Sequence, residues 1–265
     1  MASTDGVRAA VVALLALAGI VLASVRPASA IDHKNLDEGR PLRLEDAYPI
    51  ATGELALEAG GGFTLQRRGP NRGEFPVQLL WGALPNLQLE IGTALLTDPH
   101  AVDEQAKSGD LRLGALYNFN QETLWVPALA AKLEVNLPTG VDSSGVDVEL
   151  KGIVTKSFDR VSLHLNAAYE FLNGTTRGDR DGRYELALGA SVPVGAPRYT
   201  RTTLLADLFT EQSVRRGEDN VVGVEAGFRH QLTPRLVIDA GLGTEFAGPA
   251  ERSPLFGRIG ASFAF

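Results

Sequence analysis

The chain has 265 residues, of which 44% are hydrophobic, with 29 glycines, no cysteine and a formal net charge of −7. This composition favours one β-rich unit and excludes disulfides and thiolate metal sites. The negative charge argues against a nucleic-acid partner.

The first thirty residues have the pattern of a secretory signal peptide. Arg8 precedes an apolar run over residues 9–25, and the small-x-small site Ala28-Ser-Ala30 follows it. We expect residues 1–30 to be removed, so that the mature chain begins at Ile31. The alternative is an uncleaved anchor helix, for which the apolar run is barely long enough.

Residues 31–52 are charged, contain prolines and have no sustained period. We interpret them as a periplasmic N-terminal segment or a short plug. From Gly53 to Phe265 the chain alternates between apolar and polar residues, with interruptions, as β-strands with two different faces do. Residues 53–265 are therefore predicted to form a transmembrane β-barrel.

About twelve antiparallel strands account for this alternation. In the clearest, 161–171, Leu163 and Leu165 share one face, while His164 and Asn166 share the other. The least regular is 202–210, where Leu205 shares a face with Asp207. The predicted strands are 54–66, 75–83, 87–95, 111–119, 125–137, 146–158, 161–171, 184–192, 202–210, 222–229, 236–245 and 253–265.

The last strand carries the most specific signal. Its alternation ends on the aromatic residue Phe265, which is similar to the assembly signal of bacterial outer-membrane barrels. Long and short connections also alternate along the chain, as they do in such barrels. The predicted fold is an all-β, antiparallel transmembrane barrel in the bacterial outer membrane; a secreted β-sandwich is the alternative.

Several short motifs resemble a known family. These are the stretch 40–47 (RPLRLEDA), 53–58 (GELALE), 136–140 (NLPTG) and the strand 163–169 (LHLNAAY). They are similar to a family of Gram-negative outer-membrane transporters linked to the meta-pathway of phenol degradation. The resemblance implies an outer-membrane barrel that passes small solutes, including aromatic ones, and it implies no defined site residues.

Charged residues on the face opposite the apolar one are expected to line the lumen. Among the residues assigned inward, acids outnumber bases about two to one, which predicts a narrow, acidic, cation-preferring passage. The predicted lumen-lining residues are Glu58, Glu90, Arg112, Lys132, Glu134, Glu149, Lys151, His164, Glu170, Glu185, Asp207, Glu225, Arg229, Asp239 and Arg258.

Enzymatic chemistry finds little support in the sequence. His164 and Ser162 lie on the same strand face, but residues i and i+2 of a strand are about 7 Å apart, too far for a direct hydrogen bond. Asp179-Arg-Asp-Gly182 resembles a fragment of a calcium loop without the later ligands. We therefore expect no catalytic residues, no metal site and no cofactor.

The leading hypothesis is an outer-membrane channel or transporter for small solutes, including aromatic ones. The alternatives are a structural or loop-binding, adhesin-like barrel and, less favoured, a surface hydrolase. The expected partners are outer-membrane lipid and lipopolysaccharide, the barrel-assembly machinery and a small-molecule solute.

Overall fold

A computed structural model of the chain describes residues 32–37, 39–97, 107–140, 143–195 and 200–265. The predicted signal peptide, residues 1–30, lies outside the described residues. None of the described residues forms a helix long and apolar enough to cross a membrane.

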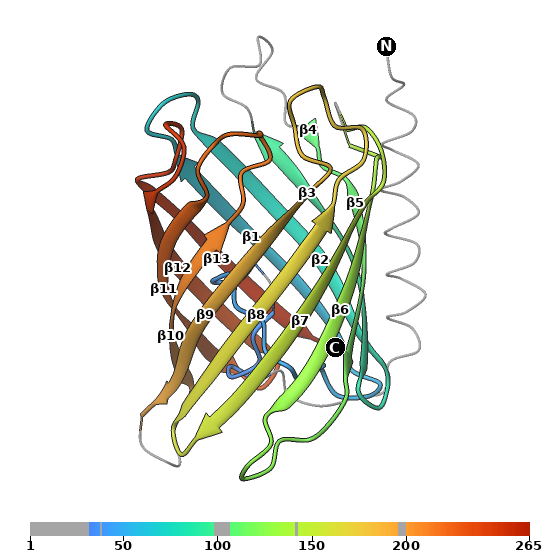
Figure 1. Cartoon of the computed structure of the whole chain (residues 1–265). Coiled ribbons are helices and arrows are strands. Elements are labelled where there is room, and N and C mark those ends of the chain that lie inside the picture. Colours follow the sequence, from blue (N-terminus) through green and yellow to red (C-terminus); the bar gives the residue numbers. More distant parts are fainter. Residues whose placement is uncertain (1–31, 38, 98–106, 141–142, 196–199) are drawn as a thin grey trace.

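The strands form one closed antiparallel barrel (Figure 1). Each long strand pairs with its neighbours in sequence, and β1 also pairs with β13, so that no long strand has a free edge. The strands are β1 (Leu55–Leu65), β2 (Arg72–Leu84), β3 (Leu87–Thr97), β4 (Lys107–Ser108), β5 (Leu111–Asn118), β6 (Ala128–Leu137), β7 (Asp147–Phe158), β8 (Val161–Phe171), β9 (Gly182–Val194), β10 (Thr202–Glu211), β11 (Val221–Thr233), β12 (Leu236–Ala247) and β13 (Leu255–Ala264).

The barrel therefore has twelve long strands, as predicted, and the two-residue β4 only extends the edge of β3. Two of the hairpins close through very short turns. Asn86 and Asp159 have positive φ angles of 68° and 54°, and Asn and Asp tolerate this conformation better than most residues. These turns define the short-turn end of the barrel; the longer connections lie at the opposite, long-loop end.

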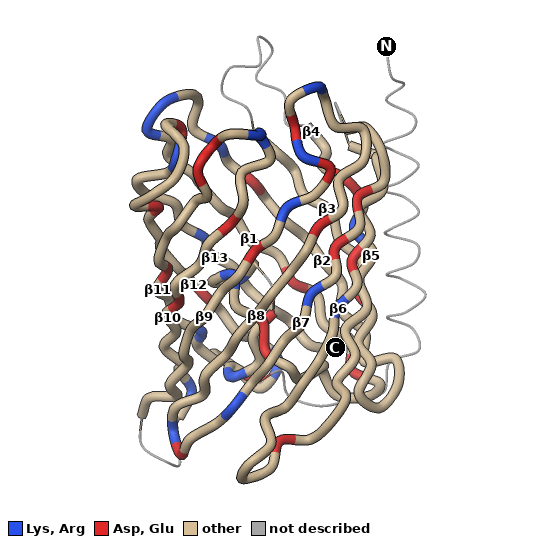
Figure 2. Tube along the Cα trace, in the orientation of Figure 1, with Lys and Arg blue, Asp and Glu red and all other residues tan. Residues whose placement is uncertain are grey.

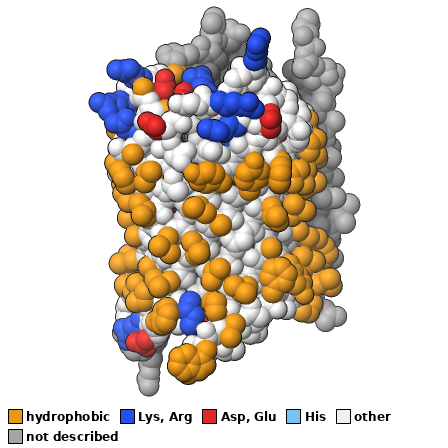
Figure 3. Space-filling model, in the orientation of Figure 1, with side chains coloured by type: hydrophobic (Ala, Val, Ile, Leu, Met, Phe, Trp, Pro, Cys, Tyr) orange, Lys and Arg blue, Asp and Glu red, His pale blue; other side chains and the backbone are white. Residues whose placement is uncertain are grey.

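The outer face of the barrel is an apolar belt, and charged side chains gather above it at the long-loop end (Figure 3). On β8, Leu165 is 44% exposed while its neighbour Asn166 is only 4% exposed. This alternation recurs around the barrel, and it places apolar side chains outward and polar ones inward. A closed ladder also satisfies the backbone hydrogen bonds of every long strand, which a bilayer core requires.

Two local predictions were wrong. Residues 125–137 were expected to form one strand, but β6 begins only at Ala128, because Thr123 and Val126 close a turn through a backbone hydrogen bond of 2.9 Å. Trp125 in this turn is 86% exposed. The loop between β3 and β5 contains the short strand β4, which was not predicted.

Candidate functional site

Residues 32–37 and 39–52, here called the N-terminal segment, run through the interior of the barrel (Figure 1). Leu36, Leu42 and Leu44 are each 2% exposed, although the segment has no regular secondary structure. Leu36 and Leu42 pack against Leu205 of β10. The irregular face of β10 is thereby explained, because its inward apolar residues have an apolar partner inside the lumen.

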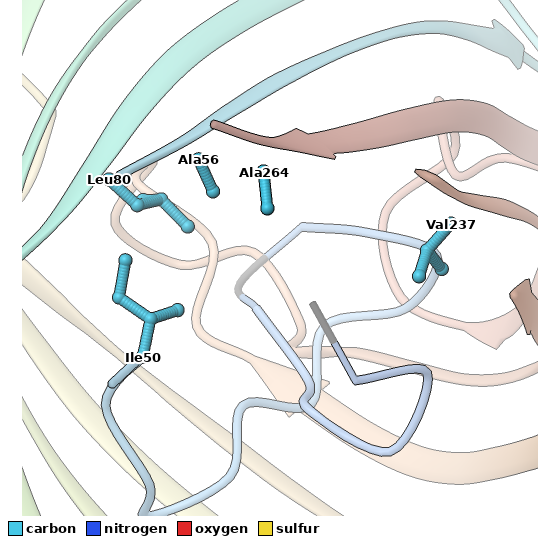
Figure 4. Packing of buried hydrophobic residues seen from close by; sticks show 5 residues of the cluster. All are labelled: Ile50, Ala56, Leu80, Val237 and Ala264. Carbon is cyan, nitrogen blue, oxygen red and sulfur yellow. The ribbon is translucent and has the colours of Figure 1, made fainter. Parts of the chain in front are cut away.

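The other end of the segment lies beside β1 and β2. Ile50 belongs to one buried apolar cluster with the inward residues Ala56, Leu80, Val237 and Ala264, which come from four different strands (Figure 4). Between these points, Ala47 packs against Leu116, Ala128, Ala130 and Ile153, while Leu44 packs against Ala187, Phe209 and Phe256.

Inward polar side chains bind the backbone of the segment directly. Asn166 accepts a hydrogen bond from the Glu45 amide (2.7 Å) and donates one to the Glu45 carbonyl (2.8 Å). Thr155 Oγ1 accepts from the Ala47 amide at 3.0 Å, and Gln88 Oε1 accepts from the Ile50 amide at 2.9 Å. The backbone groups of a buried segment outside any sheet or helix need other hydrogen-bond partners, and these side chains provide them.

Arg40 of the segment enters a buried ionic network. Its Nη2 lies 3.1 Å from Glu58 Oε2 and 3.7 Å from Asp239 Oδ2, and it donates to Ser262 Oγ at 2.7 Å. Arg229, which is fully buried, lies 3.1 Å from Asp37 of the segment. Each buried arginine therefore has carboxylate partners, as a desolvated charge requires.

Arg43 binds three inward carboxylates on three strands. Its Nη1 donates to Glu185 at 2.8 Å and to Glu211 at 2.9 Å, and its backbone amide donates to Glu225 at 2.8 Å. The guanidinium also lies 4.0 Å from the centroid of the Phe209 ring, a cation–π contact.

Glu45 supplies the opposite charge to two inward lysines. Its carboxylate lies 3.2 Å from Lys132 Nζ and 3.5 Å from Lys151 Nζ. The N-terminal segment thus contributes cations to the acidic parts of the wall and an anion to the basic part. This charge complementarity fixes its position in the lumen.

Two cavities lie on either side of the segment. The long-loop cavity, of about 430 Å³, is bordered by Arg40 of the segment and lined by Arg112, Asn136 and Glu170 among others. The short-turn cavity, of about 380 Å³, is bordered by Asp46 and Tyr48 and lined by Arg160, His164 and Ser191 among others.

Charged residues line the strands at many levels of the barrel (Figure 2), and the residues assigned to the lumen all lie on the side opposite the exposed apolar face. The buried ones are Glu58, Lys132, Lys151, His164, Asp207, Glu225, Arg229 and Asp239. The partly exposed ones are Glu90, Arg112, Glu134, Glu149, Glu170, Glu185 and Arg258.

His164 does not contact Ser162. Its Nε2 lies 2.9 Å from Ser191 Oγ on β9, and its Nδ1 lies 3.1 Å from Thr155 Oγ1 on β7. These contacts satisfy both ring nitrogens with hydroxyl groups, and neither places a carboxylate behind the imidazole as a nucleophilic triad needs.

The surroundings of two carboxylates of the segment raise their pKa values. Burial raises the pKa of Asp46 to about 7, although its oxygens accept hydrogen bonds from the amides of Leu36 and Tyr48. Burial and the neighbouring Glu58 carboxylate also raise the pKa of Asp37, against the opposing effect of Arg229.

Sequence reasoning missed the residues of the segment that organise the interior, above all Arg40, Arg43 and Glu45. Two signals pointed toward them. The inward acids of the wall lacked enough inward bases, and the inward faces of Leu205 and Phe209 lacked apolar partners. Both deficits indicate that another part of the chain occupies the lumen.

A closed antiparallel barrel with an apolar outer belt and a charged interior defines an outer-membrane β-barrel. Within that class, the family is established by sequence. The chain belongs to the family described as "Putative MetA-pathway of phenol degradation", whose model matches residues 51–260. A search of curated protein sequences gave no significant match.

Solved outer-membrane channels have the same fold. The "COG4313 outer membrane channel from Pseudomonas putida F1" is 14% identical, with a TM-score of 0.64, over 87% of this chain and 100% of that one. The NanC porin is 11% identical, with a TM-score of 0.57, over 78% and 98% of the two chains. The CymD monoaromatic hydrocarbon channel is 9% identical, with a TM-score of 0.50, over 81% and 89%.

Proposed function

We propose that this protein is an outer-membrane channel for small solutes, including aromatic ones, and that the N-terminal segment is a plug that closes its lumen. The observation that carries the proposal is the position of the N-terminal segment between a cavity at the long-loop end and a cavity at the short-turn end. A solute would enter one cavity, pass the segment when it shifts, and leave by the other.

The chemistry of the solute is inferred from the relatives. The family description refers to phenol degradation, and one of the structurally similar barrels is described as a monoaromatic hydrocarbon channel. Both cavities are lined by polar and apolar residues. Such a lining suits a small ring with a polar substituent better than a long polymer.

An acidic lumen is the second part of the proposal. Nine of the residues assigned to the lumen are carboxylates and five are lysines or arginines, so carboxylates still exceed bases when Arg40 and Arg43 of the segment are counted. A surplus of negative charge in a narrow, wet passage favours cations over anions. Insertion by the barrel-assembly machinery through the Phe265 end, and contact with lipopolysaccharide, belong to the same proposal.

Conductance in a planar bilayer tests this function. The mature protein should give small, intermittent steps of current, and the reversal potential in a salt gradient should indicate cation preference. A barrel that never conducts, even in a variant without residues 31–52 that migrates as a folded, heat-modifiable species, would favour the structural or loop-binding alternative. Anion selectivity would contradict the acidic passage.

A further inference from the structure

The long-loop cavity contains two inward polar side chains that the described part of the protein leaves without a partner. Arg112 on β5 and Asn136 on β6 are directly opposed in register, and both line the cavity. Side chains in such pairs start from Cβ atoms about 4.5–5.5 Å apart. Among the described residues, neither the guanidinium of Arg112 nor the carboxamide of Asn136 makes a hydrogen bond or an ion pair.

The carboxylates around this pair are engaged elsewhere. Asp110 accepts hydrogen bonds from the Gly140 amide (2.8 Å) and Ser143 Oγ (2.7 Å). Asp147 accepts from the Asn173 amide at 2.7 Å, and Glu170 accepts from Arg183 Nε at 2.6 Å. Arg112 is therefore not the counter-ion of these groups, and no described residue accepts a hydrogen bond from its five N–H donors.

A short apolar strip lies on β2 and β3 near Arg112 and Asn136, between the polar residues Gln78 and Glu74 of the same cavity. Pro76 on β2 and Ala94 on β3 are paired in register, and Leu96 follows Ala94 on the same inward face; all three line the cavity. Gly92, directly opposite Arg112 on β3, has no side chain to fill the space between the donors and this apolar strip. The site thus has hydrogen-bonding groups on one side and an apolar surface on the other.

The same carboxylates limit the charge of the ligand. Glu170 is paired with Arg183 at 2.6 Å, and Glu58 and Glu74 are paired with Arg40 and Arg258 of the same cavity. Asp110 and Asp147 have no cationic partner among the described residues, so an anion bound at Arg112 would be repelled by both. A neutral oxygen atom accepts hydrogen bonds from Arg112 and Asn136 without this penalty. A cavity of about 150 Å³ is large enough for benzene, so 430 Å³ holds a substituted ring together with water.

We propose that the long-loop cavity binds a neutral, oxygen-bearing monoaromatic compound of the phenol type. Arg112 donates a hydrogen bond to the oxygen, and Asn136 either donates one to it or accepts one from the hydroxyl group. The ring lies against Pro76, Ala94 and Leu96. This proposal rests on the proposed channel function and names the solute class that its entrance recognises. Weak binding suits a channel, because a solute must also leave its site.

Binding to the mature protein in nanodiscs tests the proposal, with phenol, benzoate, benzylamine and toluene as probes and empty nanodiscs as the blank. Ligand-detected NMR should give saturable binding of phenol that exceeds that of the other three. Arg112→Met should weaken phenol binding about tenfold or more, because a hydrogen bond from a charged donor is strong. Asn136→Leu should weaken phenol binding less, because it removes a hydrogen bond from a neutral group. Arg160→Met, the same change in the short-turn cavity, should have no effect.

Equal phenol binding by wild type, Arg112→Met and Asn136→Leu would overturn the proposal, as would tighter binding of benzoate or benzylamine. Heat-modifiable migration of each variant separates loss of binding from loss of folding. The outcomes also separate the two proposals. Saturable phenol binding without conductance would support the binding site and contradict the proposed channel function. Conductance without phenol binding would contradict only the binding site.

Discussion

The two sides of the lumen differ in how their inward residues are used. On β9, β10 and β13, Ala187, Phe209 and Phe256 pack against Leu44 of the N-terminal segment. At the long-loop end of β3 and β5, the inward positions instead hold Gly92, Ala94, Leu96 and Arg112, and Arg112 has no partner among the described residues. The difference indicates that the packed side positions the segment, while the open side is left for a solute.

Replacing one buried and one cavity-lining arginine should give the largest contrast between the two sides. Arg229→Met removes the partner of Asp37 and leaves that carboxylate buried, which should cost about 3–5 kcal/mol in the free energy of unfolding. Arg112→Met removes no hydrogen bond or ion pair to a described residue and should change it by less than about 0.5 kcal/mol. Urea unfolding of the reconstituted barrel measures both, and equal losses would contradict the distinction between the sides.

Adding volume should separate the sides by a smaller amount. Ala187→Phe places a ring where Leu44, Phe209 and Phe256 already pack, and overpacking of this kind costs about 1–3 kcal/mol. Ala94→Phe points the same side chain into the long-loop cavity and should leave stability unchanged while it lowers the current. A larger loss of stability from Ala94→Phe than from Ala187→Phe would contradict the presence of free space at the long-loop end of β3.

Most of the wall could be predicted from sequence, because a period-two pattern needs only local information. On β8, the side chains from Val161 to Phe171 alternate as expected. The path of the N-terminal segment could not be predicted in this way. It has no period, and its position depends on partners far away in sequence, such as Glu225 for Arg43 and Asn166 for Glu45.

The start of β6 was misassigned for a related reason. Residues 124–126 are apolar and directly precede the alternating stretch, but the turn between Thr123 and Val126 keeps them out of the ladder. In the site, sequence could assign Arg112 to the lumen, yet it could not reveal that Arg112 lacks a partner in the part of the chain that the structure describes. That feature depends on where Asp110, Asp147 and Glu170 find theirs.

Protonation of Asp46 should make the docking of the N-terminal segment depend on pH. The pKa of Asp46, raised by burial from 3.8 to about 7, lies above its unfolded value, so the docked segment retains a proton that the released segment loses. Docking is therefore most stable at low pH and weakens as pH rises toward the folded-state pKa. Channel openings should become more frequent as pH rises from about 4 to about 7, between the unfolded and the folded pKa of Asp46.

Asp46→Asn should reduce this pH dependence and leave the part that Asp37 contributes, whereas Asp32→Asn, which changes an exposed carboxylate of the same segment, should leave it intact. An unchanged profile in Asp46→Asn would assign the pH effect to another group.

The most direct measurement of the plug is a reversible lock between the segment and the wall. The chain has no cysteine, and the Ala47 amide donates to Thr155 Oγ1 of β7 at 3.0 Å, so cysteines at these two positions lie close together. With Ala47→Cys and Thr155→Cys combined and the disulfide verified by mass spectrometry, openings in a planar bilayer should disappear under oxidising conditions and return on reduction. Ala47→Cys alone should conduct in both conditions. Unchanged openings in the cross-linked protein would contradict the claim that the N-terminal segment closes the channel.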